Sequence, residues 1–396
     1  MSTRRTFFES LATLPLFASK STVTKLKTPD YFKELGLRPF INAAGTYTTL
    51  TASLMSQETM DAMEYASRQF VHLLKLQDAV GAKIASLLGA EAAMVTSGAS
   101  GAITLATASC ITGLDIPKIQ QLPNTDGLKN EVIMQKGHRY GYDHAVQTVG
   151  ARIVEIETEE DLRRAVNART AMMMFFNDGV AKGKIDAPGW VKLGKQVNVP
   201  TFNDASADAL PVERLSLYNK MGFDLVTFSG GKAICAPQST GILMGRKDLI
   251  QAAVRSTSPN ADTISRGMKV NKEEMLGLLV ALENYLKRDR VAEQKEWQSR
   301  IDTIRKTAEK FPSVTSHIDV PEIANHTPHL KMSWDRSKVK ISPVDVKKQM
   351  LEGEPSIEVT PSTNDQELVM TVWMLKPGEA EIVARRLGEI LKSATA

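Results

Sequence analysis

Short apolar runs alternate with helical patterns along the middle of this chain, and this alternation constrains the fold more than any other feature. There are seven such runs: AAMVTSG (92–98), NEVIMQKG (130–137), ARIVEIE (151–157), TAMMMFFN (170–177), VPTFND (199–204), FDLVTFSG (223–230) and GILMGR (241–246). Runs of β-type residues separated by helices indicate βα units, which build a mostly parallel sheet with helices on its faces. We therefore predict an α/β fold around a mostly parallel seven-stranded sheet.

The flanking regions complete the predicted layout. Residues 53–88 carry apolar side chains at helical spacing. Near the C-terminus, strand candidates at 329–335 and 368–375 precede a closing helix at 378–394. We predict a signal or disordered N-terminus (1–24), a large α/β domain with its N-terminal segment (25–295) and a small C-terminal α+β domain (296–396).

Charge and cysteine content argue against several classes of protein. The 49 basic and 45 acidic residues leave a net charge of +4, without a Lys/Arg block interleaved with aromatic residues. We therefore expect no nucleic-acid partner. Cys110 and Cys235 are the only cysteines and lack partners at ligand spacing, so neither a disulfide framework nor a metal site is predicted. No apolar run approaches the ~18 residues of a membrane helix, and no membrane association is expected.

The N-terminus leaves two locations open. Arg4 and Arg5 precede a short apolar stretch that ends in small residues, which resembles a twin-arginine export signal and predicts a periplasmic protein. The stretch contains Glu9 and is short. The alternative is an amphipathic N-terminal helix on a cytoplasmic protein.

Lys232 is the first candidate for chemistry. It follows a predicted strand and the residues Ser229, Gly230 and Gly231. Glycines allow another group to approach the backbone closely, and a lysine among apolar or cationic neighbours has a lowered pKa that frees its amine to attack an aldehyde. The alternatives are a solvated surface lysine, or a serine–lysine hydrolase, but the S-D-N and K-T-G elements of serine acylases are missing.

Two further motifs lie at predicted strand ends. Residues 94–102 read as a strand end, a turn of small residues and the start of a helix, whose backbone N–H groups form an anion cradle; a capped tight turn is the alternative. Asp204 ends the run VPTFND. A carboxylate there points into the crevice where α/β sheets bind ligands, unless it only caps a helix.

Together these motifs indicate pyridoxal 5′-phosphate (PLP). The cradle would hold its phosphate, Asp204 its ring nitrogen and Lys232 its aldehyde. The stretch QKGHRYGYDHA (135–145) contains four aromatic or imidazole side chains, one of which is expected to stack on the cofactor. We favour His138, with Tyr142 and His144 as alternatives.

Four stretches resemble the SelA-like branch of the fold-type I PLP-dependent enzymes, which includes selenocysteine synthase and D-glucosaminate-6-phosphate ammonia-lyase. They are AEAAMVTSGASGAITLATA (90–108), FSGGK (228–232), PQSTGILMGRKDLI (237–250) and SRGMKVNKEE (265–274). The resemblance implies that Lys232 carries the cofactor and Asp204 pairs with its ring nitrogen. It further implies that the phosphate is held by Ser97, Gly98, Ala99 and Ser229.

The same resemblance implies a homodimer or higher homo-oligomer, in which residues 46–49 and Gln238 reach a partner's cofactor. Ala236 stands where such loops commonly have glycine, and the C-terminal stretch 368–379 contains no arginine to clamp a substrate carboxylate. The candidates for binding substrate are Thr46, Tyr142, Arg266 and Lys269.

The predicted function is a PLP-dependent lyase. It would catalyse an α,β-elimination of the ammonia-lyase or dehydratase type on a small-molecule substrate, an amino acid or amino-sugar acid with a β-leaving group. Lys232 would take the α-proton, and Asp204 would keep the ring nitrogen protonated. Transaminase, racemase, retro-aldolase or β-replacement activity would use the same residues, and a non-catalytic PLP-fold protein is a further alternative.

Overall fold

The computed structural model describes residues 29–361 and 364–395, which form two units divided between Pro39 and Phe40. In the first unit, Asp30 caps the short helix α1 (Tyr31–Glu34) by accepting the Lys33 amide. Arg4 and Arg5 of the predicted export signal lie outside the described residues. The remaining elements belong to the second unit.

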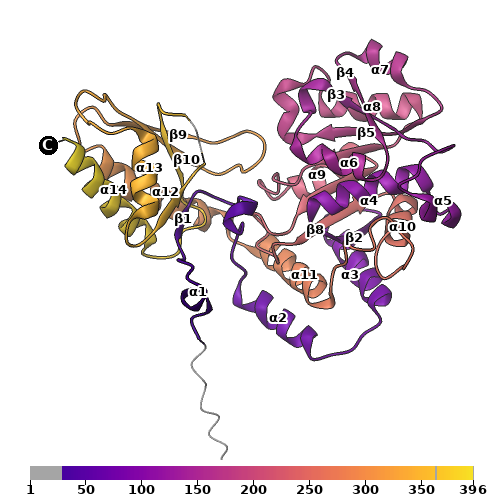
Figure 1. Ribbon diagram of the computed structural model, residues 1–396, viewed down its shortest axis with the longest axis horizontal. Coiled ribbons are helices and arrows are strands. Elements are labelled where there is room, and N and C mark those ends of the chain that lie inside the picture. Colours follow the sequence, from indigo (N-terminus) through magenta and orange to yellow (C-terminus); the bar gives the residue numbers. More distant parts are fainter. Residues whose placement is uncertain (1–28, 362–363, 396) are drawn as a thin grey trace, which may run out of the picture. The chain divides into compact units, whose positions relative to one another are not determined.

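A seven-stranded sheet in the order β2-β8-β7-β6-β5-β3-β4 forms the centre of the large α/β region (Figure 1). Its strands are β2 (Ala92–Ser97), β3 (Glu131–Gln135), β4 (Arg152–Ile156), β5 (Thr170–Phe176), β6 (Thr201–Asp204), β7 (Leu225–Ser229) and β8 (Thr240–Gly245). Neighbours pair in parallel except β8, which runs antiparallel to β2 and to β7. The predicted strands and the mostly parallel sheet are confirmed.

Central strands of the sheet are buried on both faces because they are largely apolar, as in β5 and β8. Val132 and Met134 pack into one apolar cluster, whereas Ile133 between them packs into another. This follows from the alternation of side chains along a strand. Continuous apolar runs are typical of parallel strands covered by helices on both sides.

Helices cover the sheet and continue from it. In chain order they are α2 (Gln57–Ser67), α3 (Leu73–Leu88), α4 (Gly98–Thr112), α5 (Ile116–Gln121), α6 (His144–Thr148), α7 (Glu159–Ala165), α8 (Ala187–Val197), α9 (Arg214–Met221), α10 (Lys247–Arg255) and α11 (Lys272–Lys287). Helix α4 packs across β2, β5, β7 and β8, and α8 packs on β5 and β6. The helical region predicted at 53–88 is two helices, interrupted at residues 68–72.

The C-terminal region contains α12 (Arg290–Ala308), α13 (Pro343–Glu352), α14 (Glu379–Thr395) and an antiparallel sheet of β9 (Thr315–Asp319), β10 (His329–Ser333) and β12 (Leu368–Thr371). Both predicted C-terminal strands and the closing helix are present. A separate parallel pair joins β1 (Ile41–Ala43) to β11 (Ile357–Val359). This pair connects the N-terminal segment of the unit to its C-terminal region. None of the helices in the described ranges has the length and apolarity needed to span a bilayer.

Candidate active site

Strand order brings the predicted site residues to one edge of the large sheet. Asp204 at the end of β6 pairs with Thr227 on β7, two residues before Ser229. On β8, Thr240 pairs with Ser97 of β2, and the next residue, Gly241, pairs with Ser229 of β7. Ser97 and Ser229 therefore flank the start of β8, about 10 Å apart across two strand spacings.

Close backbone packing explains the glycines before Lys232. The Gly230 amide donates to the Thr240 carbonyl at 2.8 Å, and a Cβ on Gly230 would lie 2.2 Å from the Thr240 hydroxyl oxygen. A Cβ on Gly231 would lie 2.6 Å from the Gln238 Cα. Larger residues would displace the loop, so both glycines fix the position of Lys232.

Lys232 and Asp204 line the same pocket. The pocket has a volume of about 90 Å³ and is lined by Tyr140, Tyr142, Phe176, Asn177, Asp178, Asp204, Ala205, Ser206, Ala207, Asp208, Lys232 and Ala324. Burial lowers the pKa of the Lys232 amine, against the charges of Asp204 and Asp178, which raise it. No hydrogen bond or ion pair to the Lys232 amine occurs within the described part of the chain. The amine is thus biased toward its neutral, nucleophilic form.

Asp204 is 2% exposed and has two hydrogen-bond donors. The Ser206 amide donates to its Oδ1 at 3.1 Å, and the Tyr140 hydroxyl donates to its Oδ2. Burial raises the pKa of the Asp204 carboxyl, whereas these two donors and the Lys232 charge lower it. Tyr140 is itself stacked on Phe176, with ring centroids 3.8 Å apart.

A second buried carboxylate closes one side of the pocket. Asp208 pairs with Arg214 and accepts a hydrogen bond from Asn177 at 2.7 Å, and Tyr218 also donates to it. The Ala324 amide donates to Asp208 at 3.1 Å. This network holds a segment between β9 and β10 against the pocket.

The residues predicted to form the phosphate cradle, at the start of α4, lie on the same edge of the sheet but outside the Lys232 pocket. Gly98 has a φ of +68°, and a Cβ on Gly241 would lie 2.5 Å from the Gly98 carbonyl carbon. Ser97 provides no side-chain cap for α4, and the first turn of the helix contains no acidic residue. The N–H groups of that turn can therefore donate hydrogen bonds to a bound anion.

Three predicted site residues do not line the Lys232 pocket. His138 does not line the pocket: it is fully buried, its Nδ1 accepts the Phe176 amide at 3.2 Å, and its Nε2 lies 3.3 Å from the Gln135 side chain. Burial lowers the pKa of His138 to about 4. Exposed Arg266 and Lys269 flank Met268, whose sulfur lies close to Gly101 in the first turn of α4.

Of the other predicted residues, Gln238 lies against the Lys232 loop and Tyr142 lines the pocket. Gln238 donates to the Thr48 carbonyl at 2.9 Å within the same chain. Tyr142 lines the pocket with its side chain largely exposed, whereas Thr46 is buried. Sequence reasoning missed Tyr140, Asn177, Asp178 and Asp208. The rule that placed Asp204 at a strand end also applies to Asn177 and Asp178, which follow β5 directly.

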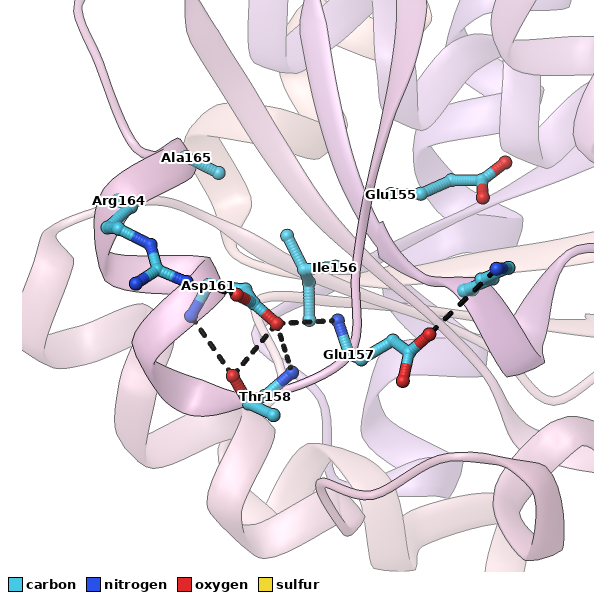
Figure 2. Close-up of a pocket in the computed structure, with 8 residues that line it drawn as sticks. Glu155, Ile156, Glu157, Thr158, Asp161, Arg164 and Ala165 are labelled. Carbon is cyan, nitrogen blue, oxygen red and sulfur yellow. Dashed lines mark hydrogen bonds and ion pairs between the residues drawn. The ribbon is translucent and has the colours of Figure 1, made fainter.

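A different cavity, of about 610 Å³, lies at the end of the edge strand β4 (Figure 2). Its charged groups pair with one another: the Lys136 amine lies 3.9 Å from the Glu157 carboxylate, and the Arg164 guanidinium lies 2.5 Å from the Asp161 carboxylate. It shares no lining residue with the Lys232 pocket. We therefore assign it no catalytic role.

A family model described as SelA, L-seryl-tRNA selenium transferase, matches residues 40–321. The chain belongs to the SelA family. Among its relatives is the D-glucosaminate-6-phosphate ammonia lyase of Salmonella typhimurium, 30% identical over 93% of this chain and 99% of the relative. A 5′-C-glycyluridine monooxygenase-decarboxylase of Streptomyces sp. is 29% identical over 91% and 92% of the two chains.

Solved structures agree with this membership. A structure of D-glucosaminate-6-phosphate ammonia-lyase superposes with a TM-score of 0.82 at 29% identity, covering 93% of this chain and all of the other. A serine palmitoyltransferase with PLP shares the fold, with a TM-score of 0.56 at 12% identity over 90% and 88% of the two chains. The resemblance and fold class predicted from the sequence are confirmed, and the SelA-family protein is a PLP-dependent enzyme. The predicted lyase class agrees with the name of the Salmonella relative.

Proposed function

We propose that this SelA-family protein is a PLP-dependent lyase that eliminates ammonia or water from an amino acid or amino-sugar acid. The observation that carries the proposal is the shared pocket of Lys232 and Asp204, an amine of lowered pKa beside a buried carboxylate. The Salmonella relative, matched along nearly its whole length, supports the ammonia-lyase reaction and a sugar-acid substrate.

The residues present fit PLP at three points. Lys232 would bind its aldehyde carbon and Asp204 its ring nitrogen, and the N–H groups of Gly98 and Ala99 at the start of α4 would bind its phosphate. Ser97 and Ser229 flank that position with their hydroxyls, and Arg266 and Lys269 lie near the same helix end. The Tyr140 hydroxyl donates a hydrogen bond to one oxygen of Asp204. For the cofactor ring nitrogen to bind this oxygen, Tyr140 must move away or both must bind it together.

The bound cofactor supplies an electron sink for the bonds of the substrate α-carbon. Lys232, with its lowered pKa, is suited to take the α-proton and later return a proton to product. The buried Asp204 charge would hold a proton on the ring nitrogen, and its 2% exposure keeps water from screening that charge. Because His138 is enclosed elsewhere, we propose Tyr142 or Tyr140 as the ring that contacts the cofactor.

Covalent labelling tests the cofactor assignment. The purified full chain should turn yellow with PLP, and borohydride should fix the cofactor on the peptide that contains Lys232. Lys232→Ala should take no fixed label at this position, whereas Lys269→Ala should still be labelled at Lys232. A label found on another lysine, or a protein that takes up no PLP, would refute the assignment.

Product analysis tests the reaction. We expect ammonia and a 2-oxo acid from a panel of D- and L-amino acids with β-hydroxyl groups that includes D-glucosaminate and its 6-phosphate. Clean transamination, racemisation or retro-aldol cleavage without elimination would exclude the lyase reaction. Bound PLP without turnover of any member would favour the non-catalytic alternative.

We also propose that the active unit is a homodimer or higher homo-oligomer. Support comes from large apolar side chains exposed on and around α2 and at the start of α3: Leu54, Met60, Tyr65, Phe70, Val71 and Leu74. Phe70→Asp should reduce the molar mass in light scattering, whereas Leu114→Asp, at an exposed site before α5, should not. A parent protein that is a fully active monomer at high dilution would contradict the proposal.

For location, we propose twin-arginine export from the Arg4-Arg5 pattern alone. Export of this type carries folded, cofactor-loaded proteins, which suits a PLP enzyme. Cells expressing the parent or an Arg4→Lys, Arg5→Lys variant are fractionated and the N-termini sequenced. We expect the parent protein in the periplasm with its N-terminus cleaved, and the variant in the cytoplasm. Equal cytoplasmic retention of both proteins without cleavage would place the protein in the cytoplasm.

A further inference from the structure

Two consecutive residues between β9 and β10 have a left-handed backbone conformation. Ala324 has a φ of +58° and Asn325 has a φ of +44°. Residues with a Cβ atom rarely adopt this conformation, although asparagine tolerates it better than alanine. Such strain persists only where the surrounding structure imposes it, and it is concentrated at functional sites. The neighbours of Ala324 must therefore hold it in place.

The turn that follows β6 holds both residues by their backbone. The Ala324 amide donates to the Asp208 carboxylate at 3.1 Å, and the Asn325 amide donates to the Ala207 carbonyl at 2.9 Å. Ala207 and Asp208 come three and four residues after Asp204. A segment of the C-terminal region is therefore fastened to the part of the chain that continues from Asp204.

The Asp208 anchor is itself fixed. Asp208 is 1% exposed and pairs with Arg214. Asn177 and Tyr218 also donate hydrogen bonds to its carboxylate. Arg214 reaches the segment as well, because its guanidinium donates to the Glu322 carbonyl at 2.5 Å. Breaking a buried charge pair is strongly unfavourable, so the segment is a fixed wall and not a loose loop.

Ala324 is the residue through which this segment reaches the Lys232 pocket. Within 321–327, all of which the structure describes, it is the one residue that lines the pocket, and it is 5% exposed. The pocket has a volume of about 90 Å³, so a few carbon atoms added to this wall would fill a large share of it. Glycine would adopt the left-handed conformation without strain. The methyl group of Ala324 is therefore present against the conformational preference of its position.

We propose that Ala324 is a specificity-determining residue, whose side chain limits the size of the substrate that the Lys232 pocket accepts. The Asp208 anchor holds its methyl group at the wall that the C-terminal region contributes to the pocket. A larger side chain at this position restricts the pocket to small amino acids, and glycine admits bulkier ones. This inference rests on the proposed function and identifies the residue that selects among its substrates.

Binding of amino acids of graded size tests the proposal without turnover. The PLP-loaded full chain is titrated with glycine, D- and L-serine and D-glucosaminate, and binding is read as a saturable change in cofactor absorbance. The variants are Ala324→Gly and Ala324→Leu. The matched control is Asn325→Gly, at the adjacent left-handed residue, which does not line the pocket.

The measured quantity is the affinity for D-glucosaminate relative to that for glycine. Ala324→Leu should lower this ratio roughly tenfold or more, since a single methylene is worth at least that much in a close-fitting pocket. Ala324→Gly should raise the ratio, and Asn325→Gly should leave it unchanged. An unchanged ratio in both Ala324 variants would overturn the inference. So would an equal change in Asn325→Gly, because mobility of the segment would then explain the effect.

Thermal unfolding separates this role from a structural one. Ala324→Gly relieves a left-handed residue, so its unfolding midpoint should stay the same or rise, as should that of Asn325→Gly. A lowered midpoint with an unchanged affinity ratio would show that the methyl group only packs. Leucine tolerates a left-handed conformation poorly, so Ala324→Gly decides the question if Ala324→Leu does not fold.

A second assay needs neither cofactor nor turnover. The full chain without PLP is treated with acetaldehyde or benzaldehyde and cyanoborohydride, and labelling of the Lys232 peptide is measured by mass spectrometry. The benzaldehyde-to-acetaldehyde ratio at Lys232 should rise in Ala324→Gly and fall in Ala324→Leu, while the ratio at exposed Lys269 stays constant. Equal ratios in the parent and both variants would contradict the proposal. Because PLP binding and product formation are read separately, failure of this inference and failure of the proposed function are distinguishable.

Discussion

Replacing Asp204 with asparagine should remove a charge from the site while keeping its hydrogen bonds. The asparagine oxygen can accept the Ser206 amide, which donates to Asp204 at 3.1 Å, and its amide group can donate to the Tyr140 oxygen. Burial raises the pKa of Asp204, so the ionised carboxylate is a cost to the folded protein. We therefore expect unchanged or slightly higher thermal stability.

The loss should appear in turnover. Removing one preorganised charged partner from a water-excluded site costs about 3–4 kcal/mol of transition-state stabilisation, or roughly two to three decades in rate. The 2% exposure of Asp204 places it in this regime. The assay compares PLP content by absorbance, the unfolding midpoint, and ammonia release at saturating PLP.

Asp208→Asn provides the contrast. Asp208 is also buried but pairs with Arg214, so its replacement leaves a largely buried guanidinium without its partner and should lower the unfolding midpoint. If Asp204→Asn binds PLP and turns over at the parental rate, another group serves the ring nitrogen. If instead it unfolds as readily as Asp208→Asn, the Asp204 carboxylate is structural.

Three further outcomes are expected for the pocket and for the loop that carries Lys232. The rate of PLP attachment, followed by stopped-flow absorbance, should rise with pH with a pKa below the ordinary 10.5 of lysine, because burial lowers the pKa of Lys232. This pKa should fall further in Asp204→Asn, because the variant lacks a negative charge that raises the pKa of Lys232. A rate curve that is not shifted would contradict this expectation. Tyr140→Phe should speed PLP uptake roughly tenfold, because it frees one oxygen of Asp204, whereas slower uptake would show that Tyr140 orients the carboxylate. Gly231→Ala should cost about 1–3 kcal/mol of stability in denaturant unfolding, since its Cβ would lie 2.6 Å from the Gln238 Cα, and an unchanged midpoint would show that the loop yields freely.

The sequence was sufficient to predict the strands because most of them are apolar runs between turn residues. It did not reveal that β8 runs antiparallel, since an apolar run such as GILMGR has the same pattern in either direction. The break between α2 and α3 was also invisible, because residues 68–72 contain neither glycine nor proline. Both features depend on packing between distant segments rather than on local preference.

The site was predictable where a local rule applies. Asp204 ends β6 and Lys232 follows β7 after two glycines, and parallel strand ends meet at one edge. The aromatic residue beside the pocket was harder to assign, because His138 and Tyr140 are only two residues apart. Tertiary packing alone decides that His138 is buried away from the pocket and that Tyr140 contacts Asp204. Ala324 and Trp373 lie far along the chain from their contacts at Asp208 and Gly45, so no local pattern connects them.

The position of β8 has a consequence for how the protein is made. Because β8 lies between β2 and β7, the edge that carries Ser97 and Ser229 is not continuous until this late strand has inserted between two earlier ones. A nascent chain that ends before Gly245 therefore lacks the framework that aligns its cradle with Lys232. Strand insertion over such sequence separation is intrinsically slow. During synthesis, acquisition of PLP should consequently trail completion of the central sheet, and yellow colour should report that step.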